Sequence, residues 1–236
     1  MLLILAGVAF LRTGIARRWL QFILAPSAAA LFELVGRKLA KRKLRPPSSA
    51  VISGLIIALV LQPGVLWYVP VFAALAAIGS KYLLRIDGRH IFNPAAFGLM
   101  LSAIIFGVYF FWWGAPGTTL VILLGSAITL RYRRLHLILP FLSLQLLIMT
   151  VYYGSLSVAA LMVNYFFVFV MLIEPKTSPV KKRGRIIYGL SAAILISALV
   201  MLDAPFDPWI GGLLAANLTV PFLNRKAAVK NSGVRP

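Results

Sequence analysis

Polar residues that could do chemistry are few in this chain, and most stand at the ends of apolar runs. Glu174 ends the run FVFVMLIE, and Thr177 and Ser178 follow it closely. A carboxylate at such a place is costly unless it is paired, which makes it a candidate functional group. Its alternative role is an ion pair with Lys176 or Arg185 at the membrane interface. The two hydroxyl groups either hold the edge or phosphate of a flavin or cap the following turn.

Two further candidates, Asn93 and Asp207, each stand directly before a proline in similar motifs. The motif FNPAAFGLM begins at Phe92, and the motif FDPWIGGLL begins at Phe206. An Asn or Asp side chain before a helix accepts hydrogen bonds from free backbone N–H groups, and proline fits the first helical turn. We therefore expect a helix to begin at each motif, with each side chain either capping the helix or contacting a ligand.

Asn164 and Asn217 lie inside apolar runs, where an amide either bonds a neighbouring helix or faces a ligand. The candidate cofactor-binding residues are therefore Asn93, Glu174, Thr177, Ser178, Asp207 and Asn217. No catalytic residue is assigned. The chain has only five Asp and Glu residues, so we expect no carboxylate-rich metal site.

Several other chemistries are excluded or disfavoured. The chain contains no cysteine, which rules out disulfides and Cys-ligated iron–sulfur clusters within it. His90 and His136 both stand in basic stretches, which argues against a haem held by two histidines inside the membrane. No P-loop, GxGxxG or HExxH motif is present.

The composition is that of a polytopic membrane protein. Of 236 residues, 61% are hydrophobic, and the mean hydropathy is +0.93. The formal net charge is +19, and the basic residues cluster in short loops, as the positive-inside rule expects. We therefore expect a multi-pass protein of the cell (plasma) membrane, with a cytoplasmic C-terminus, contact with the lipid bilayer and no nucleic-acid partner. Trp67, Trp112 and Trp113 fit an aromatic belt at the outer interface.

Basic loops alternate with loops poor in Lys and Arg, and these loops separate a series of apolar runs. The runs are rich in Leu, Ala and Ile without strand-like alternation, which predicts helices. They cover residues 51–61, 68–80, 95–111, 120–130, 137–151, 156–173, 186–202 and 209–223. Residues 19–35 either span the membrane or lie in the interface. Residues 1–11 form an apolar run that is short for a membrane crossing. We expect an all-α polytopic membrane helix bundle of about eight to ten transmembrane segments.

The two proline motifs are part of a longer internal repeat. Phe92 and Phe206 are 114 positions apart, and a second pair, Pro63 and Pro175, is 112 positions apart. The charge pattern places the first motif inside and the second outside, so the halves run in opposite directions. Such an inverted repeat with broken helices surrounds a site near the bilayer midplane in many transporters.

The repeat divides one predicted membrane domain, residues 1–236, into five parts. They are N-terminal helices (1–49), a first repeat core (50–111), connecting helices (112–161), a second repeat core (162–225) and a basic cytoplasmic tail (226–236).

Five segments of the chain, which overlap the two proline motifs, resemble a known family. They read SGLIIALVLQP, SKYLLRIDGRHIFNPAAFG, GTTLVILLGSAITLRYRRLHLILPF, FVFVMLIEPKTSPVKKRGRIIYG and PWIGGLLAANLTVPFLNRK. In this order, over roughly residues 50–225, the chain resembles the membrane subunits RnfD and NqrB of ion-pumping ferredoxin and NADH oxidoreductases. The resemblance implies a fold related to that of urea transporters, with two inverted halves of about five helices each.

The resemblance also implies a flavin, but the family's attachment site is missing. Members hold FMN on a threonine in an SGAT motif, in a long loop after the FNPA helix. Here the chain passes almost directly from that helix to GAPGTTLV, and Thr118 and Thr119 match the start of the next helix. We therefore expect a flavin (FMN or riboflavin) bound non-covalently, or a quinone.

Three functions fit these features. The first is an electron-transport subunit, a possible part of a membrane oxidoreductase, that works with other membrane and cytoplasmic subunits and is coupled to ion movement. The second is a small-solute transporter or channel that uses the same fold without redox chemistry. The third is a structural subunit that scaffolds a larger complex. Fold alone does not decide among them.

Overall fold

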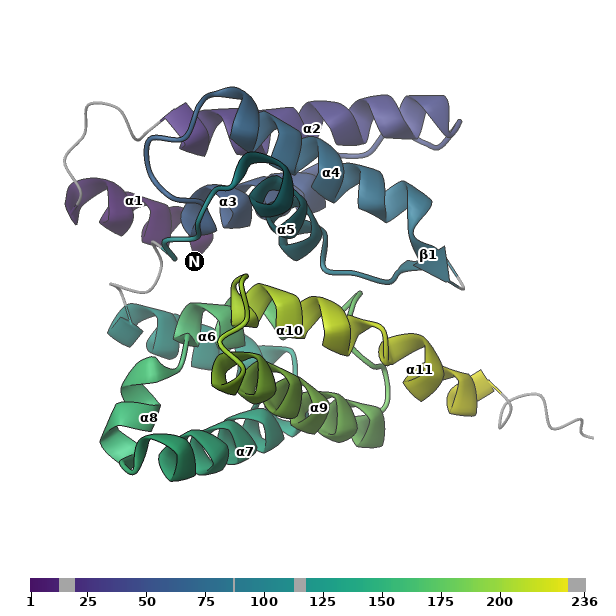
Figure 1. Cartoon of the computed structure of the whole chain (residues 1–236). Coiled ribbons are helices and arrows are strands. Elements are labelled where there is room, and N and C mark those ends of the chain that lie inside the picture. The colour runs from purple at the N-terminus through teal and green to yellow at the C-terminus, as the bar shows by residue number, and fades with distance from the viewer. Residues whose placement is uncertain (13–19, 87, 113–117, 229–236) are drawn as a thin grey trace, which may run out of the picture.

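The computed structural model describes residues 1–12, 20–86, 88–112 and 118–228, and most of these residues are helical (Figure 1). The elements in chain order are α1 (Leu2–Arg12), α2 (Leu20–Leu39), α3 (Ser48–Val60), α4 (Tyr68–Leu83), β1 (Arg85–Ile86), β2 (Arg89–His90), α5 (Pro94–Phe106), α6 (Thr118–Arg131), α7 (Leu135–Tyr153), α8 (Leu156–Met162), the π-helical segment η2 (Phe167–Met171), α9 (Lys182–Met201), α10 (Pro208–Asn217) and α11 (Val220–Ala228).

Three of the described helices, α2, α7 and α9, are long and apolar enough to cross a membrane. Four shorter apolar helices, α3 to α6, accompany them. The N-terminal run that was expected either to span or to lie in the interface belongs to α2, which has 20 residues. By contrast, α1 has 11 residues, fewer than the roughly 20 that a straight crossing needs. The all-α membrane class is therefore confirmed for the described part of the chain.

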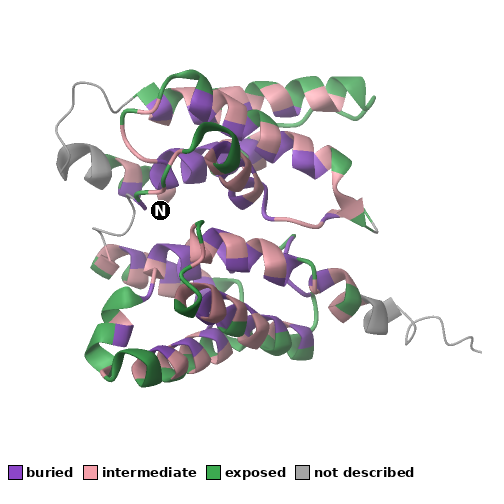
Figure 2. Cartoon of the chain, in the orientation of Figure 1, coloured by how far each residue is buried: buried purple, intermediate pink, exposed green. Residues whose placement is uncertain are grey.

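The helices form two stacked groups, which we call the first half (α1–α5) and the second half (α6–α11) (Figure 1). In the first half, α2 packs on α3 and α4, and α4 packs on α5. In the second half, α7 packs on α9, and α9 packs on α10. Helices α5 and α10 contact each other and join the halves. Buried residues line the inside of each half and the seam between them (Figure 2).

Glycines allow two of these helix pairs to pack closely. A Cβ atom at Gly98 of α5 would overlap the backbone carbonyl oxygen of Ala73 on α4. A Cβ atom at Gly212 of α10 would overlap the side chain of Ile196 on α9. Gly98 and Gly212 occupy the same place in the two proline motifs, so the motifs share a packing role.

The prediction of one continuous helix over 156–173 is wrong. Helix α8 ends at Met162, and the chain becomes helical again near Phe167. The side chain of Asn164 accepts a hydrogen bond from the backbone N–H of Phe167 at 2.9 Å. Asn competes for backbone groups in this way, so it ends one helical segment and starts the next, rather than bonding a neighbouring helix.

The prediction of one helix over 209–223 is also wrong. Helix α10 ends at Asn217, and α11 begins at Val220. Pro221 has no backbone N–H to donate to the carbonyl oxygen of Asn217, and its ring would clash with that oxygen in a continuous helix. The amide of Asn217 is taken up by tertiary hydrogen bonds. The break leaves Asn217 at a helix end, where it can reach other segments.

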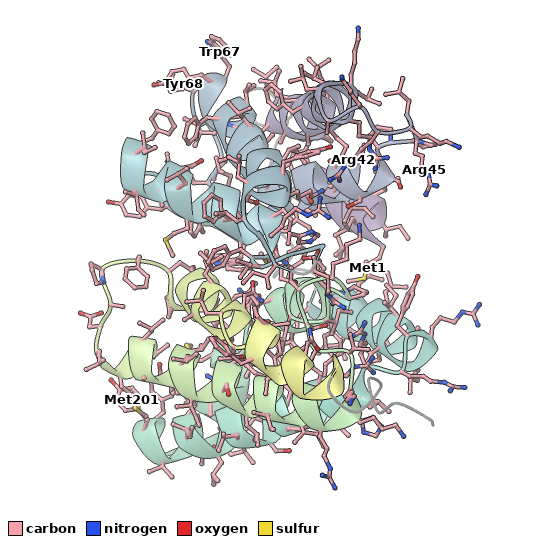
Figure 3. All side chains as sticks on the ribbon, turned by 90° about the vertical axis from the view of Figure 1, so that its right-hand side faces the viewer. Met1, Arg42, Arg45, Trp67, Tyr68 and Met201 are labelled. Carbon is pink, nitrogen blue, oxygen red and sulfur yellow. The ribbon has the colours of Figure 1, made fainter. Side chains whose placement is uncertain are left out.

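Of two tryptophans expected in an aromatic belt, Trp67 is exposed and Trp112 is buried. Trp67 is 62% exposed, and it lies with Tyr68 far from Arg42 and Arg45 (Figure 3). Trp112 is only 8% exposed, and its indole N–H donates to Asp207 Oδ2 at 2.9 Å. A buried partner therefore holds Trp112 away from the lipid interface. Trp113 lies outside the described residues.

Candidate functional site

Five of the six candidate residues form one connected cluster, and two asparagines lie at its centre. Asn217 Oδ1 accepts a hydrogen bond from the backbone N–H of Asn93 at 2.8 Å. Asn217 Nδ2 donates to the hydroxyl oxygen of Tyr188 at 2.7 Å and to the carbonyl oxygen of Thr177 at 3.2 Å. Asn217 is fully buried and Asn93 is 2% exposed. The amide of Asn217 thus joins α10 to α9, to the loop after η2 and to the start of α5.

The same loop contains Glu174, Thr177 and Ser178, which bond one another. The hydroxyl of Thr177 donates to Glu174 Oε2 at 3.2 Å, and that of Ser178 donates to the carbonyl oxygen of Glu174 at 2.7 Å. The hydroxyl groups therefore fix the loop around Glu174. Across the seam, His90 Nε2 lies 3.6 Å from Glu174 Oε1. The structure thus pairs Glu174 with His90 of the first half. It does not pair Glu174 with Arg185, which donates to the backbone oxygen of Pro179.

Both proline motifs begin helices as predicted. The Asn93 side chain accepts from the backbone N–H of Ala96 at 3.0 Å, and the Asp207 side chain accepts from that of Ile210 at 2.9 Å. Proline occupies the first turn of each helix. The side chain of Asn93 also donates to the carbonyl oxygen of Met171 at 3.3 Å, so it both caps α5 and holds η2.

Asp207 stands apart from the other five candidates. It begins α10, whereas Asn217 ends it, and ten helical residues separate the two by about 15 Å. Burial raises the pKa of Asp207, while the hydrogen bonds from Ile210 and Trp112 act in the opposite direction. Asn93 meets the end of α10, and Trp112, a few residues beyond α5, meets its start. Helices α5 and α10 are therefore antiparallel, and their capping residues lie at opposite ends of the pair.

Two arginines of the cluster were missed by the sequence reasoning. The guanidinium group of Arg89 donates to the carbonyl oxygens of Pro175, Lys176 and Ser178 at 2.8, 2.9 and 3.1 Å. Arg134 is 7% exposed and donates to the hydroxyl of Ser178 at 3.0 Å. The positive-inside rule accounts for the basic loops that contain them but gives neither arginine a partner. Arg89 binds backbone carbonyl groups and Arg134 binds a hydroxyl group, and all of these belong to a broken helix end that the sequence pattern did not locate.

Burial is the largest cause of the shift in the pKa of Arg134. It lowers the pKa of the guanidinium to about 10, and the like charges of Arg185 and Arg89 add to the effect. The group remains cationic at neutral pH. Through their hydrogen bonds, Arg89, Arg134 and Arg185 hold the loop from residue 175 to residue 179.

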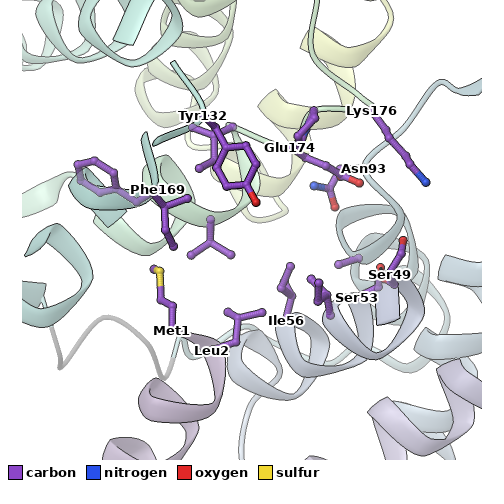
Figure 4. A pocket seen from close by; sticks show the side chains of 16 residues that line it. Met1, Leu2, Ser49, Ser53, Ile56, Asn93, Tyr132, Phe169, Glu174 and Lys176 are labelled. Atoms are coloured by element: carbon purple, nitrogen blue, oxygen red, sulfur yellow. Dashed lines mark hydrogen bonds between the residues drawn. The ribbon is translucent and has the colours of Figure 1, made fainter. Parts of the chain in front are cut away.

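A cavity of about 400 Å³ lies beside this cluster, between the two halves. Its volume and mostly apolar walls are typical of small-molecule sites. Asn93, Glu174 and Lys176 lie together at one end, and the hydroxyl of Tyr132 points inward (Figure 4). The polar lining is Ser49, Ser53, Asn93, Tyr132, Glu174 and Lys176. A planar organic ring would find apolar contacts along the walls and hydrogen-bonding groups at one end.

A second, smaller pocket of about 50 Å³ lies near the same loop. Its lining includes Arg89, His90 and Asn224, and Lys176 lines both this pocket and the larger cavity. Within the described residues, no three His, Asp or Glu side chains gather as a metal site would require. Thr177, Ser178 and Asn217 do not line the cavity but support residues that do.

These features define a class: an all-α membrane protein whose interrupted helices meet beside a ligand-sized cavity. The chain belongs to the NQR2, RnfD, RnfE family, whose family model matches residues 1–121. The predicted resemblance is thereby confirmed. The match includes Asn93 and the first proline motif but ends before the loop that contains Glu174.

Similar proteins of known description are ion-translocating oxidoreductase complex subunits D. The one from Rhodobacter capsulatus is 31% identical over 99 residues, which cover 40% of this chain and 28% of the relative. The one from Shewanella sediminis is 37% identical over 101 residues, which cover 41% of this chain and 29% of the relative. The aligned part therefore spans less than a third of each relative.

Proposed function

We propose that this chain is an electron-transport subunit of a membrane oxidoreductase complex, of the kind that the names of its relatives describe. In this proposal the cavity next to Asn93 and Glu174 binds a flavin non-covalently, or a quinone. Electrons pass between this ligand and other membrane and cytoplasmic subunits, with coupled ion movement. The flavin or quinone supplies the electron chemistry, and the protein supplies binding, orientation and electrostatics.

The observation that carries the proposal is the cavity itself. Its apolar walls suit a tricyclic flavin ring or a quinone ring, and Asn93 and Glu174 offer hydrogen-bonding groups at the polar end. Glu174 and the Asn93 side chain are held in place by Thr177, Met171 and Ala96. A site that is fixed before the ligand arrives loses less entropy on binding.

The absorbance spectrum of the detergent-purified chain tests the proposal. We expect a flavin band that acid releases from the protein, or a quinone that solvent extracts. Ser53→Phe, which fills the cavity, should remove the ligand, whereas Leu123→Phe on the exposed face of α6 should retain it. A wild-type chain that binds neither added riboflavin nor an added short-chain quinone would contradict the proposal.

We also propose that the two halves form an inverted repeat, with about eight to ten crossings and a cytoplasmic C-terminus. The antiparallel packing of α5 and α10 supports this arrangement, as do the matching roles of Gly98 and Gly212. Prolines inside α2 and α7 add further support, because Pro26 and Pro140 are also 114 positions apart. Prolines are common in helices of this kind, where neighbouring segments satisfy the freed carbonyl groups.

A small-solute transporter is the second candidate, and the interrupted helices favour it. The discriminating result is a colourless purified chain that moves a solute into liposomes. Ser53→Phe should then block transport rather than remove a chromophore.

A further inference from the structure

His90 and Glu174 come from different halves and form a partly buried pair at their seam. The distance from His90 Nε2 to Glu174 Oε1 is 3.6 Å, slightly longer than a hydrogen bond. His90 is 9% exposed, and its Nε2 atom has no hydrogen-bond partner among the described residues. A buried ring nitrogen without a partner is unusual in a native structure and calls for an explanation.

The pair separates two spaces. Glu174 lines the large cavity, and His90 lines the smaller pocket on the side of the basic loops. Lys176 borders both spaces, and Asn224 and Pro221 complete the far wall of the smaller pocket. A proton that enters the smaller pocket therefore meets His90 first, and Glu174 is the next acceptor before the cavity.

The groups that face the pair suit it to proton transfer. Thr177 donates to Glu174 Oε2, which leaves Oε1 toward His90. The titratable groups of Lys81 on α4 and Tyr188 on α9 are bonded elsewhere, to Ser49 and Asn217. Arg89, next to His90, directs its guanidinium to backbone carbonyl groups. Imidazole is the side chain whose charge changes between about pH 5 and 8 in ordinary surroundings.

We infer that His90 and Glu174 form a proton-transfer pair that delivers protons from the smaller pocket to a redox ligand in the large cavity. This inference rests on the proposed function, because flavins and quinones take up two protons when two electrons reduce them fully. The electrons come separately, from a reduced iron–sulfur or flavin carrier in a partner subunit.

The transfer moves one proton at a time, and each bond to hydrogen that breaks is matched by one that forms. Protonated His90 gives its Nε2 proton to the Glu174 carboxylate, so one N–H bond breaks and one O–H bond forms. The carboxylic acid of Glu174 then gives that proton to the anionic nitrogen or oxygen of the reduced ligand. A proton from the bulk solvent, carried by water through the smaller pocket, then binds Nε2 of His90 and restores its starting state. His90 never touches the ligand, whereas Glu174 does.

The experiment measures proton uptake by the full chain in detergent, loaded with riboflavin. A light flash with a photoreductant reduces the flavin, and an indicator dye follows the proton. We expect His90→Gln and Glu174→Gln to slow uptake by about 10²-fold, the lower end of the usual contribution of acid–base groups. His136→Gln, a change at the other histidine on an exposed position in the first turn of α7, should leave the rate unchanged.

A rescue measurement separates proton transfer from a structural role. His90→Ala should regain rapid uptake when imidazole is added, since free imidazole can occupy the vacated space, and Glu174→Gln should not. Unslowed uptake in both Gln variants would overturn the inference while the bound flavin still supports the proposed function. Loss of riboflavin from His90→Gln would also overturn it, because His90 lies outside the cavity. Failure of the wild-type chain to bind riboflavin or a quinone would instead contradict the proposed function.

Discussion

At the scale of single residues, Asn217 holds the site together. Its amide bonds the backbone N–H of Asn93, the carbonyl oxygen of Thr177 and the hydroxyl of Tyr188, all in buried surroundings. Bonding between segments is one of the two roles that the sequence left open for this residue, because an amide inside an apolar run needs a partner. The identity of the partners was not predictable, since they lie 29 to 124 positions away.

Asn217→Ala should lower stability markedly. Each buried group that loses its partner costs about 1–3 kcal/mol, and this substitution leaves three such groups. Thermal unfolding in detergent measures the effect. Asn224→Ala is the matched control, since its side chain accepts a single exposed hydrogen bond from Val180. Equal melting temperatures for the two variants would contradict the central role of Asn217.

Asp207 should make stability depend on pH. Burial raises its pKa in the folded protein, so the native state holds the proton more tightly than the unfolded chain. The stabilising contribution of this group is therefore complete below the unfolded pKa of about 3.9 and is lost as pH rises through the folded pKa. Asp207→Asn retains an oxygen to cap α10 and cannot ionise. We expect its melting temperature relative to the wild type to rise as pH increases from acid to neutral, and a constant difference would contradict this.

At the scale of elements, the beginnings of helices were easier to predict than their interruptions. The Asn–Pro and Asp–Pro pairs identified the starts of α5 and α10 because capping depends on residues within one turn. The breaks near Asn164 and Asn217 were missed because the surrounding residues remain apolar. Hydropathy reports the preference for lipid or protein surroundings and not the hydrogen bonds that end a helix.

The glycines of the two proline motifs give a prediction at this scale. Gly98→Ala should destabilise the chain by about 1–3 kcal/mol or more, because its Cβ would meet the backbone of Ala73. Gly212→Ala should also destabilise the chain, because its Cβ would overlap Cγ1 of the buried, β-branched Ile196 and lie 3.2 Å from the Ile196 backbone. Gly79→Ala, which meets nothing within 4 Å, should be neutral or stabilising because alanine favours helices. Thermal unfolding of the three variants tests these expectations.

At the scale of the whole molecule, the polar seam between the halves was the least predictable part of the site. The sequence places Arg89 and His90 in a basic stretch, yet the β1–β2 hairpin turns them toward the loop after η2. Charge patterns along a sequence describe which loops are basic. They do not describe which basic side chains will find a broken helix end more than 80 positions away.

If the two halves are inverted, the start of the first proline motif and the start of the second lie on opposite sides of the membrane. Cysteines placed near them should therefore be labelled from opposite sides. Because the chain has no cysteine, single-cysteine variants at Ile86 and Phe206, both exposed, report their positions without background. A membrane-impermeant thiol reagent added to intact cells should label Phe206→Cys and not Ile86→Cys. Inside-out vesicles should give the reverse. Labelling of both variants from one side would contradict the inverted repeat.

The hydrogen bond between Asn93 and Asn217 has a consequence for biogenesis. Its two partners are 124 positions apart, so the ribosome delivers them on the order of ten seconds apart at about 5–20 residues per second. During that interval the backbone N–H of Asn93 has to bond water, lipid headgroups or the insertion machinery. The backbone N–H of Asn93 in the nascent first half therefore lacks its final partner until a residue 124 positions further along has been made.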